Sequence, residues 1–287
     1  MSVPSSLKLG PNTSLTLVKK RYIIFYIFLI WISIFSIQFE FWLYWNWLYG
    51  PILEEPKLFV HFLLLLPLAA FIMYLSSILI SLLFAKILLI FVNLFHKPRE
   101  GIFLRDKSDK DYRYWSIRNT IKKWPIWISH KFPFPFMDNI CFKMFGVKTK
   151  YSNSLFEGWV DTEFIEFGKN IVVGQGSVVQ SAVIVGNLFI IRKTIIEDKV
   201  VIGSQSIVMP GTHMKKYSIL GGHSMTTIGQ ELEESWIYLG APAKKFKKNV
   251  FFEDGLEEII KRQGEKTIES IDRFEELYTV RKDKETE

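Results

Sequence analysis

Apolar residues recur every six positions between residues 167 and 224, with one shorter step from Val185 to Ile190. Glycine follows the apolar residue in five of these units, and a serine or threonine stands four places after it in six of them. Such a short unit has room for one strand and one corner, so the pattern predicts a parallel β-helix with three units in each triangular coil. The apolar residue should point into this prism, and glycine should take the corner, where a Cβ atom would clash. The predicted inward column comprises Phe167, Val173, Val179, Val185, Ile190, Ile196, Ile202, Val208, Met214 and Leu220.

Two motifs close the repeat. The first runs from Val201 to Thr212 and reads VIGSQSIVMPGT, and the second runs from Trp236 to Lys244 and reads WIYLGAPAK. In their order and spacing these motifs resemble the ends of the hexapeptide-repeat acyltransferases, a family whose pattern is aliphatic-Gly-x-x-small-x. The resemblance covers roughly residues 150 to 249. It implies a left-handed β-helix, a homotrimer formed through the prism faces, and acyl-CoA as co-substrate.

Two long uncharged stretches precede the repeat. The first runs from Tyr22 to Phe39 and continues into an aromatic cluster that ends at Trp47, and the second runs from Leu58 to Ala85. Both approach or exceed the ~20 apolar residues needed to cross a bilayer, and aromatic clusters settle at its boundary. We therefore expect a transmembrane hairpin that turns at Gly50-Pro51, with Pro67 as a candidate kink. Buried core helices of a soluble protein are the weaker alternative, because such helices are usually shorter.

The flanking cations predict the orientation of this hairpin. Cations cluster before the first stretch and after the second, whereas the connecting loop holds only Lys57. Cytoplasmic flanks carry the excess of lysine and arginine, so both termini and the repeat should be cytoplasmic, in a cell or internal membrane. A cleaved signal peptide is not expected, because the first apolar run is longer than the apolar region of such a peptide. The flanking cations are Lys19, Lys20, Arg21, Lys97, Arg99, Arg105 and Lys107.

The segment from residue 97 to residue 150 interleaves cations with aromatic residues. Such a mixture can stack on single-stranded nucleic acid, but beside two apolar spans it favours a segment in the lipid headgroup plane. We therefore expect membrane lipids and no nucleic acid as partners. Pro125, Pro133 and Pro135 should divide the segment into short pieces.

The chain ends in a tail of different composition. From Glu253 onward there are twelve acidic and seven basic residues, a charge of −5 against +7 for the whole chain, so the remainder carries +12. Ile268, Ile271, Phe274 and Tyr278 recur at helical spacing and predict an amphipathic helix. The single cysteine, Cys141, excludes an intramolecular disulfide and a cysteine-based zinc site, which fits a reducing cytoplasm.

The resemblance also suggests where catalysis occurs. In the family, a histidine in the groove between neighbouring prisms takes the proton of the acceptor hydroxyl or amine, a task that suits imidazole. Of five histidines, only His213 and His223 lie in the repeat. His223 follows two glycines on an outward corner and is the first candidate, and His213 is the alternative. Either residue could equally be an exposed histidine without a catalytic role. The sugar acetyltransferases carry their histidine in an earlier loop, and the matching stretch here, Asn187 to Lys193, has none.

The glycines of the corners and the final motif are the candidate cofactor contacts. By resemblance, their backbone faces the pantetheine arm of acyl-CoA and the lysines meet its phosphates as point charges. A lysine run can equally be a solvated or membrane-touching patch. The residues concerned are Gly203, Gly221, Gly222, Gly240, Ala241, Pro242, Ala243, Lys244 and Lys245.

These observations predict a mostly β chain in five segments: a cytoplasmic N-terminal segment (1–21), a transmembrane helical hairpin (22–96), a membrane-interface segment (97–150), a β-helix domain (151–249) and a helical tail (250–287). The expected function is transfer of an acyl group to a hydroxyl or amine of a membrane-presented sugar, lipid or polymer precursor, without a metal. A non-catalytic trimeric scaffold, or an accessory domain of a peptide or polymer synthetase, is the main alternative. A zinc carbonic anhydrase of the β-helix type is more remote, since it needs three histidine ligands.

Overall fold

The computed structural model describes residues 20–52, 57–106, 108–155 and 158–250. The N-terminal segment up to residue 19 and the predicted tail helix beyond residue 250 lie outside the described residues. So does the centre of the loop between the two apolar stretches.

Two long helices begin the described chain. A 3₁₀ turn, η2 (Lys20–Tyr22), leads into α1 (Ile23–Ile52), and α2 (Lys57–Phe95) follows. Both are long and apolar enough to cross a membrane, a test that a signal sequence or a soluble core helix also passes. A core helix is mostly buried, whereas only 17% and 28% of the apolar windows here are buried inside the protein.

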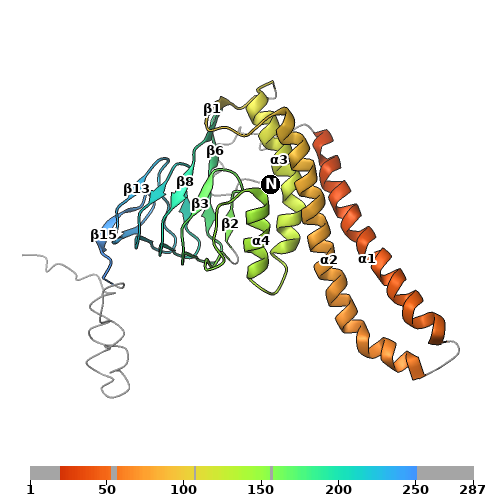
Figure 1. Cartoon of the computed structure of the whole chain (residues 1–287). Coiled ribbons are helices and arrows are strands. Elements are labelled where there is room, and N and C mark those ends of the chain that lie inside the picture. The colour runs from red at the N-terminus through yellow and green to blue at the C-terminus, as the bar shows by residue number, and fades with distance from the viewer. Residues whose placement is uncertain (1–19, 53–56, 107, 156–157, 251–287) are drawn as a thin grey trace, which may run out of the picture. The chain divides into compact units, whose positions relative to one another are not determined.

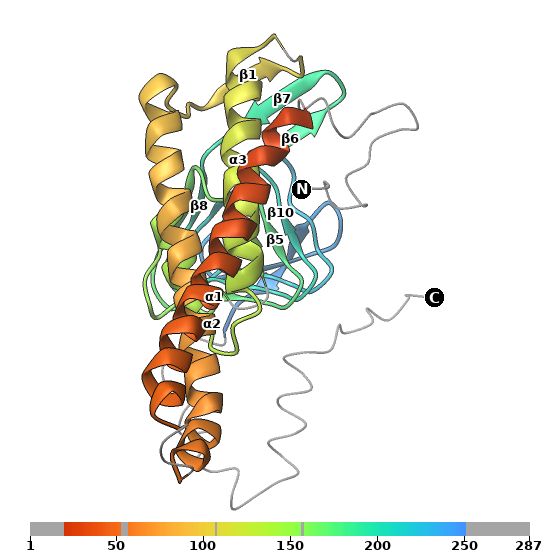
Figure 2. The same cartoon turned by 90° about the vertical axis from the view of Figure 1, so that its right-hand side faces the viewer.

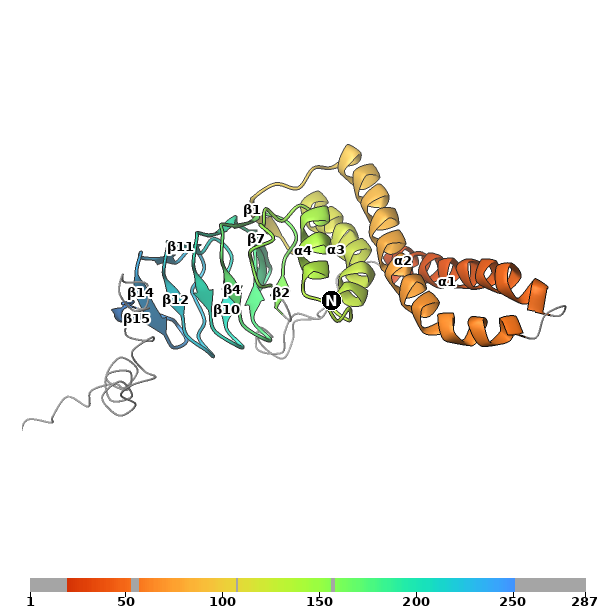
Figure 3. The same cartoon turned by 60° about the horizontal axis from the view of Figure 1, so that its bottom comes forward.

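The structure contradicts one of the two expectations for the prolines of the hairpin. Gly50 and Pro51 belong to the last turn of α1 and are not the free turn that the sequence predicts. Helix α2 continues through Pro67, the candidate kink, and its axis bends toward its N-terminal end (Figure 3).

The interface segment folds into β1 (Gly101–Leu104), α3 (Lys110–Ser129) and α4 (Phe136–Phe145). The side chain of Asp109 caps α3 by accepting the N–H of Tyr112. The expected break at Pro125 is wrong, because α3 runs through this residue. A proline removes only one helical hydrogen bond, and here α3 also packs against α1 and α2. The indole N–H of Trp124, for example, lies 3.0 Å from Oγ of Ser33 in α1.

Helices α3 and α4 lie between the β-helix and the α1–α2 pair (Figure 1). Phe142 and Phe145 of α4 are buried together with Ile165 from the first coil and with Leu155, which precedes that coil. Repeat folds need such a cap, because a terminal coil would otherwise expose its core to water. These two helices and the segment between them also expose large apolar side chains, at Trp127, Phe134 and Phe136.

Residues 158–250 form the predicted parallel β-helix, whose coils stack along one axis (Figures 1 and 3). The first side consists of β2 (Trp159–Val160), β5 (Val178–Val179) and β10 (Ile207–Val208). The second consists of β3 (Ile165–Phe167), β8 (Thr194–Ile196), β11 (His213–Met214) and β13 (Glu231–Leu232). The third consists of β4 (Val172–Val173), β9 (Val201–Ile202), β12 (Ile219–Leu220), β14 (Trp236–Leu239) and β15 (Lys244–Lys248).

The strand register gives the coil length. His213 pairs with Ile195 in the preceding coil and with Glu231 in the next, and each pairing spans three repeat units along the chain. The inward column is buried, for example at Ile202 and Met214. The small hydroxylated column is buried as well, and two of its members bond to the next coil: Ser177 Oγ donates to the carbonyl of Gly203, and Ser206 Oγ to that of Gly221, both at 2.7 Å. The repeat therefore encodes both the core and the bonding between coils.

One part of the predicted repeat is wrong. Val185 and Ile190 do not belong to the inward column but to an antiparallel hairpin of β6 (Ala182–Val185) and β7 (Leu188–Ile191). Val178 pairs with Ile207, whereas Ile195 pairs with His213, so the coil that holds the hairpin is longer than a regular one by almost two repeat units. The hairpin is apolar at almost every position, and such a run matches the column of the repeat by composition alone.

The hairpin is joined to the segment after α2. Strand β1 pairs antiparallel with β7 and completes a three-stranded sheet beside the start of α3 (Figure 2). Phe189 is fully buried there, and its ring centroid lies 4.6 Å from that of Trp115. Elsewhere along α3, Arg118 and Lys122 bind Glu163 from the first coil at 2.8 Å. Burial alone would raise the pKa of Glu163, but the two cations outweigh it and hold that pKa below its usual range.

Candidate functional site

The outward face of the second side carries the polar groups with the clearest chemistry. Register places Glu166, Ile195, His213 and Glu231 in one outward row on successive strands, and we call this surface the His213 face. Nε2 of His213 lies 2.7 Å from Oε1 of Glu197, which stands at the corner two residues after Ile195. Both side chains are about one-third exposed, so a bound molecule could reach them.

The pairing fixes how the imidazole can act. An ionised carboxylate only accepts hydrogen bonds, so Nε2 of a neutral His213 carries the proton and Nδ1 keeps the free lone pair. The other oxygen of Glu197 accepts the backbone N–H of Lys216 at 3.2 Å and is thereby held in place. An imidazole oriented by a fixed carboxylate is the arrangement that a general base requires.

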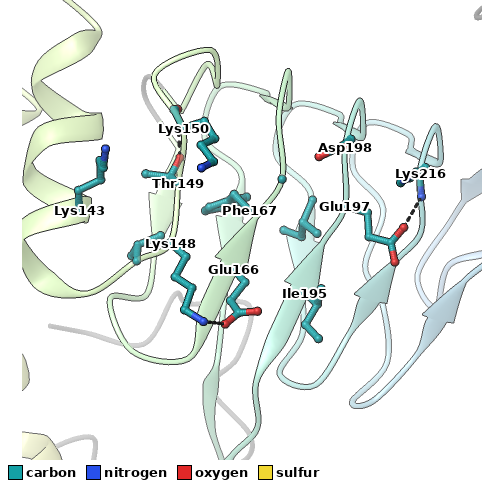
Figure 4. A pocket seen from close by; sticks show the side chains of 13 residues that line it. Lys143, Lys148, Thr149, Lys150, Glu166, Phe167, Ile195, Glu197, Asp198 and Lys216 are labelled. Atoms are coloured by element: carbon teal, nitrogen blue, oxygen red, sulfur yellow. Dashed lines mark hydrogen bonds and ion pairs between the residues drawn. The ribbon is translucent and has the colours of Figure 1, made fainter.

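A groove of about 540 Å³ runs over the His213 face toward α4 (Figure 4). Its apolar lining includes Val147, Phe167, Ile195 and Ile196, and its charged lining consists of Lys143, Lys148, Lys150, Glu166, Glu197, Asp198 and Lys216. The volume lies within the ~300–1,000 Å³ of small-molecule sites. Glu197 links the two features, because it lines the groove and also binds His213.

The carboxylates of the groove are already engaged. Glu166 is bound by Lys148 and by Lys193, the latter at 2.9 Å, and these hydrogen bonds hold the pKa of Glu166 below its usual range. Asp198 accepts the backbone N–H of Lys169 at 2.7 Å. The groove thus keeps its acids paired.

The first candidate histidine, His223, lies at a different place. It occupies the corner after β12, with a positive φ of 56° and its N–H bonded to the carbonyl of Ser204 in the preceding coil. Its ring is exposed, and in the described part of the chain no group lies within hydrogen-bond distance of it. His223 therefore has access to solvent but not the orienting partner that His213 has.

The predicted glycines do gather at this corner, for a packing reason. A Cβ on Gly203 would lie 2.4 Å from the nitrogen of Gly222, and one on Gly221 would lie 2.1 Å from a methyl of Leu239. The final motif joins the same corner, since the N–H of Gly240 donates to Oγ of Ser224 at 3.0 Å. These segments of the sequence therefore meet in the folded chain.

The remainder of the final motif closes the β-helix. Ala241 and Pro242 are exposed, whereas Ala243 is buried and its carbonyl accepts a hydrogen bond from the side-chain amide of Gln230 at 2.8 Å. Lys245 is bound to Glu233, so Lys244 is the freer of the two predicted lysines.

The stretch from Asn187 to Lys193 is the tip and second strand of the inserted hairpin. Its backbone is bound to the segment after α2: the carbonyl of Asn187 accepts the N–H of Arg105 at 2.8 Å, and the N–H of Lys193 donates to Glu100 at 2.7 Å. The loop thus serves here as a connection to the helices.

One buried acid and one buried thiol lie outside the groove. Burial raises the pKa of Asp161 to about 6, although its carboxylate accepts the N–H groups of Ser181 and Ala182 at the base of the hairpin. Burial likewise raises the pKa of the Cys141 thiol, which makes it a weak nucleophile. Among the residues that the structure describes, no three His, Cys, Asp or Glu side chains are placed to hold a metal ion.

Sequence reasoning missed Glu197 and the lysines around the groove. A coil of three repeat units sets Ile195 beside His213, so a corner carboxylate two places later was a usable signal for Glu197. Lys143, by contrast, comes from α4, and no repeat pattern brings this helix to the groove.

Comparison with known proteins gives the following results. No family model matches the chain, and no curated protein matches it. Among solved structures, a single-residue mutant of AntD, an N-acyltransferase from Bacillus cereus in complex with dTDP-4-amino-4,6-dideoxyglucose and coenzyme A, is 22% identical with a TM-score of 0.29. The alignment covers 34% of this chain and 60% of AntD, so this chain spans less than two thirds of that protein.

Two further structures match more of their own length. The hexapeptide-repeat-containing acetyltransferase VCA0836 from Vibrio cholerae is 13% identical with a TM-score of 0.33, over 42% of this chain and 84% of that one. A maltose O-acetyltransferase from Clostridium difficile 630 is 14% identical with a TM-score of 0.31, over 39% of this chain and 75% of that one.

Proposed function

We propose that this chain is a membrane-anchored acyltransferase on a left-handed β-helix, which moves the acyl group of an acyl-CoA to a hydroxyl or amine of a membrane-presented sugar, lipid or polymer precursor. The observation that carries the proposal is the 2.7 Å contact between His213 and Glu197 beside the groove. It supplies an oriented base where a small acceptor can lie. On this ground His213 takes precedence over His223, which the sequence alone favours.

The proposed step uses Nδ1 of His213. The acceptor hydroxyl gives its proton to Nδ1 while its oxygen attacks the thioester carbonyl, and Glu197 stabilises the imidazolium that forms. The tetrahedral intermediate then collapses, the carbon–sulfur bond breaks, and the CoA thiolate takes the proton from His213. Backbone N–H groups at the coil corners are available to stabilise the intermediate oxyanion.

Acyl-CoA is assigned to the corner of Gly203, Gly221 and Gly222 and to the final motif from Gly240 to Lys245. The exposed Ala241 and its neighbour Pro242 offer backbone to the pantetheine arm, and Lys244 offers a charge to the phosphates.

A homotrimer is proposed because the site needs a second copy: His213 lies on one face of the prism, whereas the CoA corner borders another face. Val172 supports this assembly, since 46% of it is exposed on the third side and a neighbouring prism would cover it.

Membrane anchoring is proposed from the large exposed apolar surface of α1 and α2, for example at Trp31 and Leu64, which are 56% and 72% exposed. Such a surface is costly in water and suits lipid. Both termini and the β-helix are assigned to the cytoplasmic side on the cation asymmetry.

The test measures acetyl-CoA binding by the full-length protein in detergent, and CoA release when a membrane lipid extract is added. His213→Ala should lower turnover by about 10²- to 10⁴-fold and leave acetyl-CoA affinity almost unchanged. Lys244→Ala should weaken acetyl-CoA binding and have less effect on turnover at saturating acetyl-CoA. Undiminished turnover in His213→Ala with loss in His223→Ala would transfer the role to His223, and absence of CoA binding by the unmodified protein would favour the scaffold.

A further inference from the structure

The groove on the His213 face begins at α4, a helix that contacts the second apolar helix. Helix α4 packs against α2, and Nζ of Lys86 in α2 donates to the carbonyl of Met144 at 2.6 Å. The preceding residue, Lys143, lines the near end of the groove, while Glu197 lines it further along the β-helix (Figure 4). The groove therefore leads from α4, the helix that packs on α2, toward the His213–Glu197 pair.

The near end of this path has uncompensated positive charge. Among the residues that the structure describes, no carboxylate lies within 4.0 Å of the ammonium group of Lys143 or of Lys150. Both side chains are exposed, and Lys143 is held 4.2 Å above the ring of Tyr151. Lys148 is different, because its charge is matched by Glu166.

The floor of the path suits an organic head group. Phe167 and Ile196 are buried beneath it and Ile195 is half-buried on it, which gives an apolar strip between the lysines and His213. The paired carboxylates of Glu166 and Glu197 border this strip and can accept hydrogen bonds from hydroxyl groups.

We propose that Lys143 and Lys150 bind the phosphate of a lipid-linked acceptor, whose lipid chain stays in the bilayer beside α2 and whose hydroxyl-bearing head group lies along the strip to His213. The assignment of the far end to the reacting hydroxyl rests on the proposed acyl transfer. The assignment of the near end rests only on the two unpaired ammonium groups and on the packing of α4, which carries Lys143, against α2. A phosphate matches two point charges, and a lipid tail beside α2 would lie close to α4, where the groove starts.

The experiment measures equilibrium binding of radiolabelled dodecyl phosphate to the full-length protein in neutral detergent, with inorganic phosphate as competitor. The double variant Lys143→Gln/Lys150→Gln should bind roughly 25-fold more weakly, at about fivefold for each lysine near a lipid surface. Added salt should weaken binding to the unmodified protein more than binding to the double variant. Lys169→Gln is the matched control, since it removes the same charge from an exposed corner outside the groove, and its affinity should be unchanged.

The outcomes separate this proposal from the acyl transfer. An equal loss of dodecyl phosphate affinity in Lys169→Gln, or an unchanged affinity in the double variant, would overturn the phosphate site even if His213→Ala abolishes acyl transfer. Binding of inorganic phosphate as tight as that of dodecyl phosphate would overturn the lipid-linked source. Lysine-dependent binding of dodecyl phosphate by a protein that binds no acyl-CoA would keep the site and remove the transfer reaction.

Discussion

The glycine at the corner after β9 provides a sharp test of the fold. A Cβ on Gly203 would stand 2.4 Å from the nitrogen of Gly222 and 2.6 Å from the carbonyl carbon of Gly221. Ordinary contact begins at 3.4 Å, so the two coils would have to part by about 3.4 − 2.4 = 1.0 Å. Both obstacles are backbone, and the hydrogen bond from Gly203 N–H to the carbonyl of Leu220, at 2.7 Å, opposes the movement.

This geometry sets the expected cost of Gly203→Ala. Overpacking of a filled site costs about 1–3 kcal/mol, while the reduced entropy of the unfolded chain returns about 0.4–1 kcal/mol. A net loss of about 1–2 kcal/mol should lower Tm by roughly 2–8 °C for a protein of this size. Thermal unfolding of the full-length protein in detergent, followed by circular dichroism in the β-sheet region, measures it.

Gly222→Ala is the matched control at the same corner. Its Cβ would meet only the carbonyl of Ser204, at 3.5 Å, and its φ lies outside the left-handed region. Its Tm should therefore stay level or rise slightly. Equal Tm values for Gly203→Ala and Gly222→Ala would refute the account of the corner as a close approach of two coils.

Three further outcomes are expected. Glu197→Gln should lower turnover at least tenfold and leave acetyl-CoA affinity unchanged, because the amide can donate to Nε2 of His213 and leave the proton on Nδ1. Turnover equal to that of the unmodified protein would contradict the assignment of His213 as the base. Because the pKa of Asp161 is raised to about 6 from 3.8, the folded state binds the proton more tightly than the unfolded state, and the stability that this residue contributes at low pH is lost as pH rises from about 4 to 6. Over that window the Tm difference between Asp161→Asn and the unmodified protein should shift in favour of the variant. A Tm difference that does not change with pH would contradict the raised pKa. A cysteine at Glu54 should react with an impermeant maleimide from outside the cell, against a low background because Cys141 is buried. Protection of that site, together with reaction of a cysteine at Lys284 from outside, would reverse the proposed topology.

Much of the fold follows from local pattern. The coil length of three repeat units, the inward column and the buried hydroxyl column all recur in the sequence at the period that the structure uses. The two apolar helices follow from length and composition in the same way. The inserted hairpin does not, because Val185 and Ile190 match the apolar column of the repeat without belonging to it. Only the pairing of β7 with β1, from a segment much earlier in the chain, distinguishes a hairpin from another coil.

The candidate site, like the fold, was predictable from the sequence only in part. The corner of Gly203, Gly221 and Gly240 was predictable, because successive coils stack equivalent positions. The preference between His213 and His223 was not, since it depends on whether a carboxylate lies beside the ring. The repeat pattern shows that both histidine side chains point outward, but the 2.7 Å distance between His213 and Glu197 is a property of the folded chain.

The sequence by itself determined the three-sided β-helix, the two apolar helices before it and the set of residues at its corners, because these depend on side chains at short, regular spacing. The tertiary structure decided how the parts serve one another: α3 runs unbroken through Pro125 because α1 and α2 support it, and α4 brings Lys143 to the His213 face. These contacts join residues far apart in the chain. Their free energy comes from burial and charge pairing that exist only after folding, so no periodicity along the chain records them.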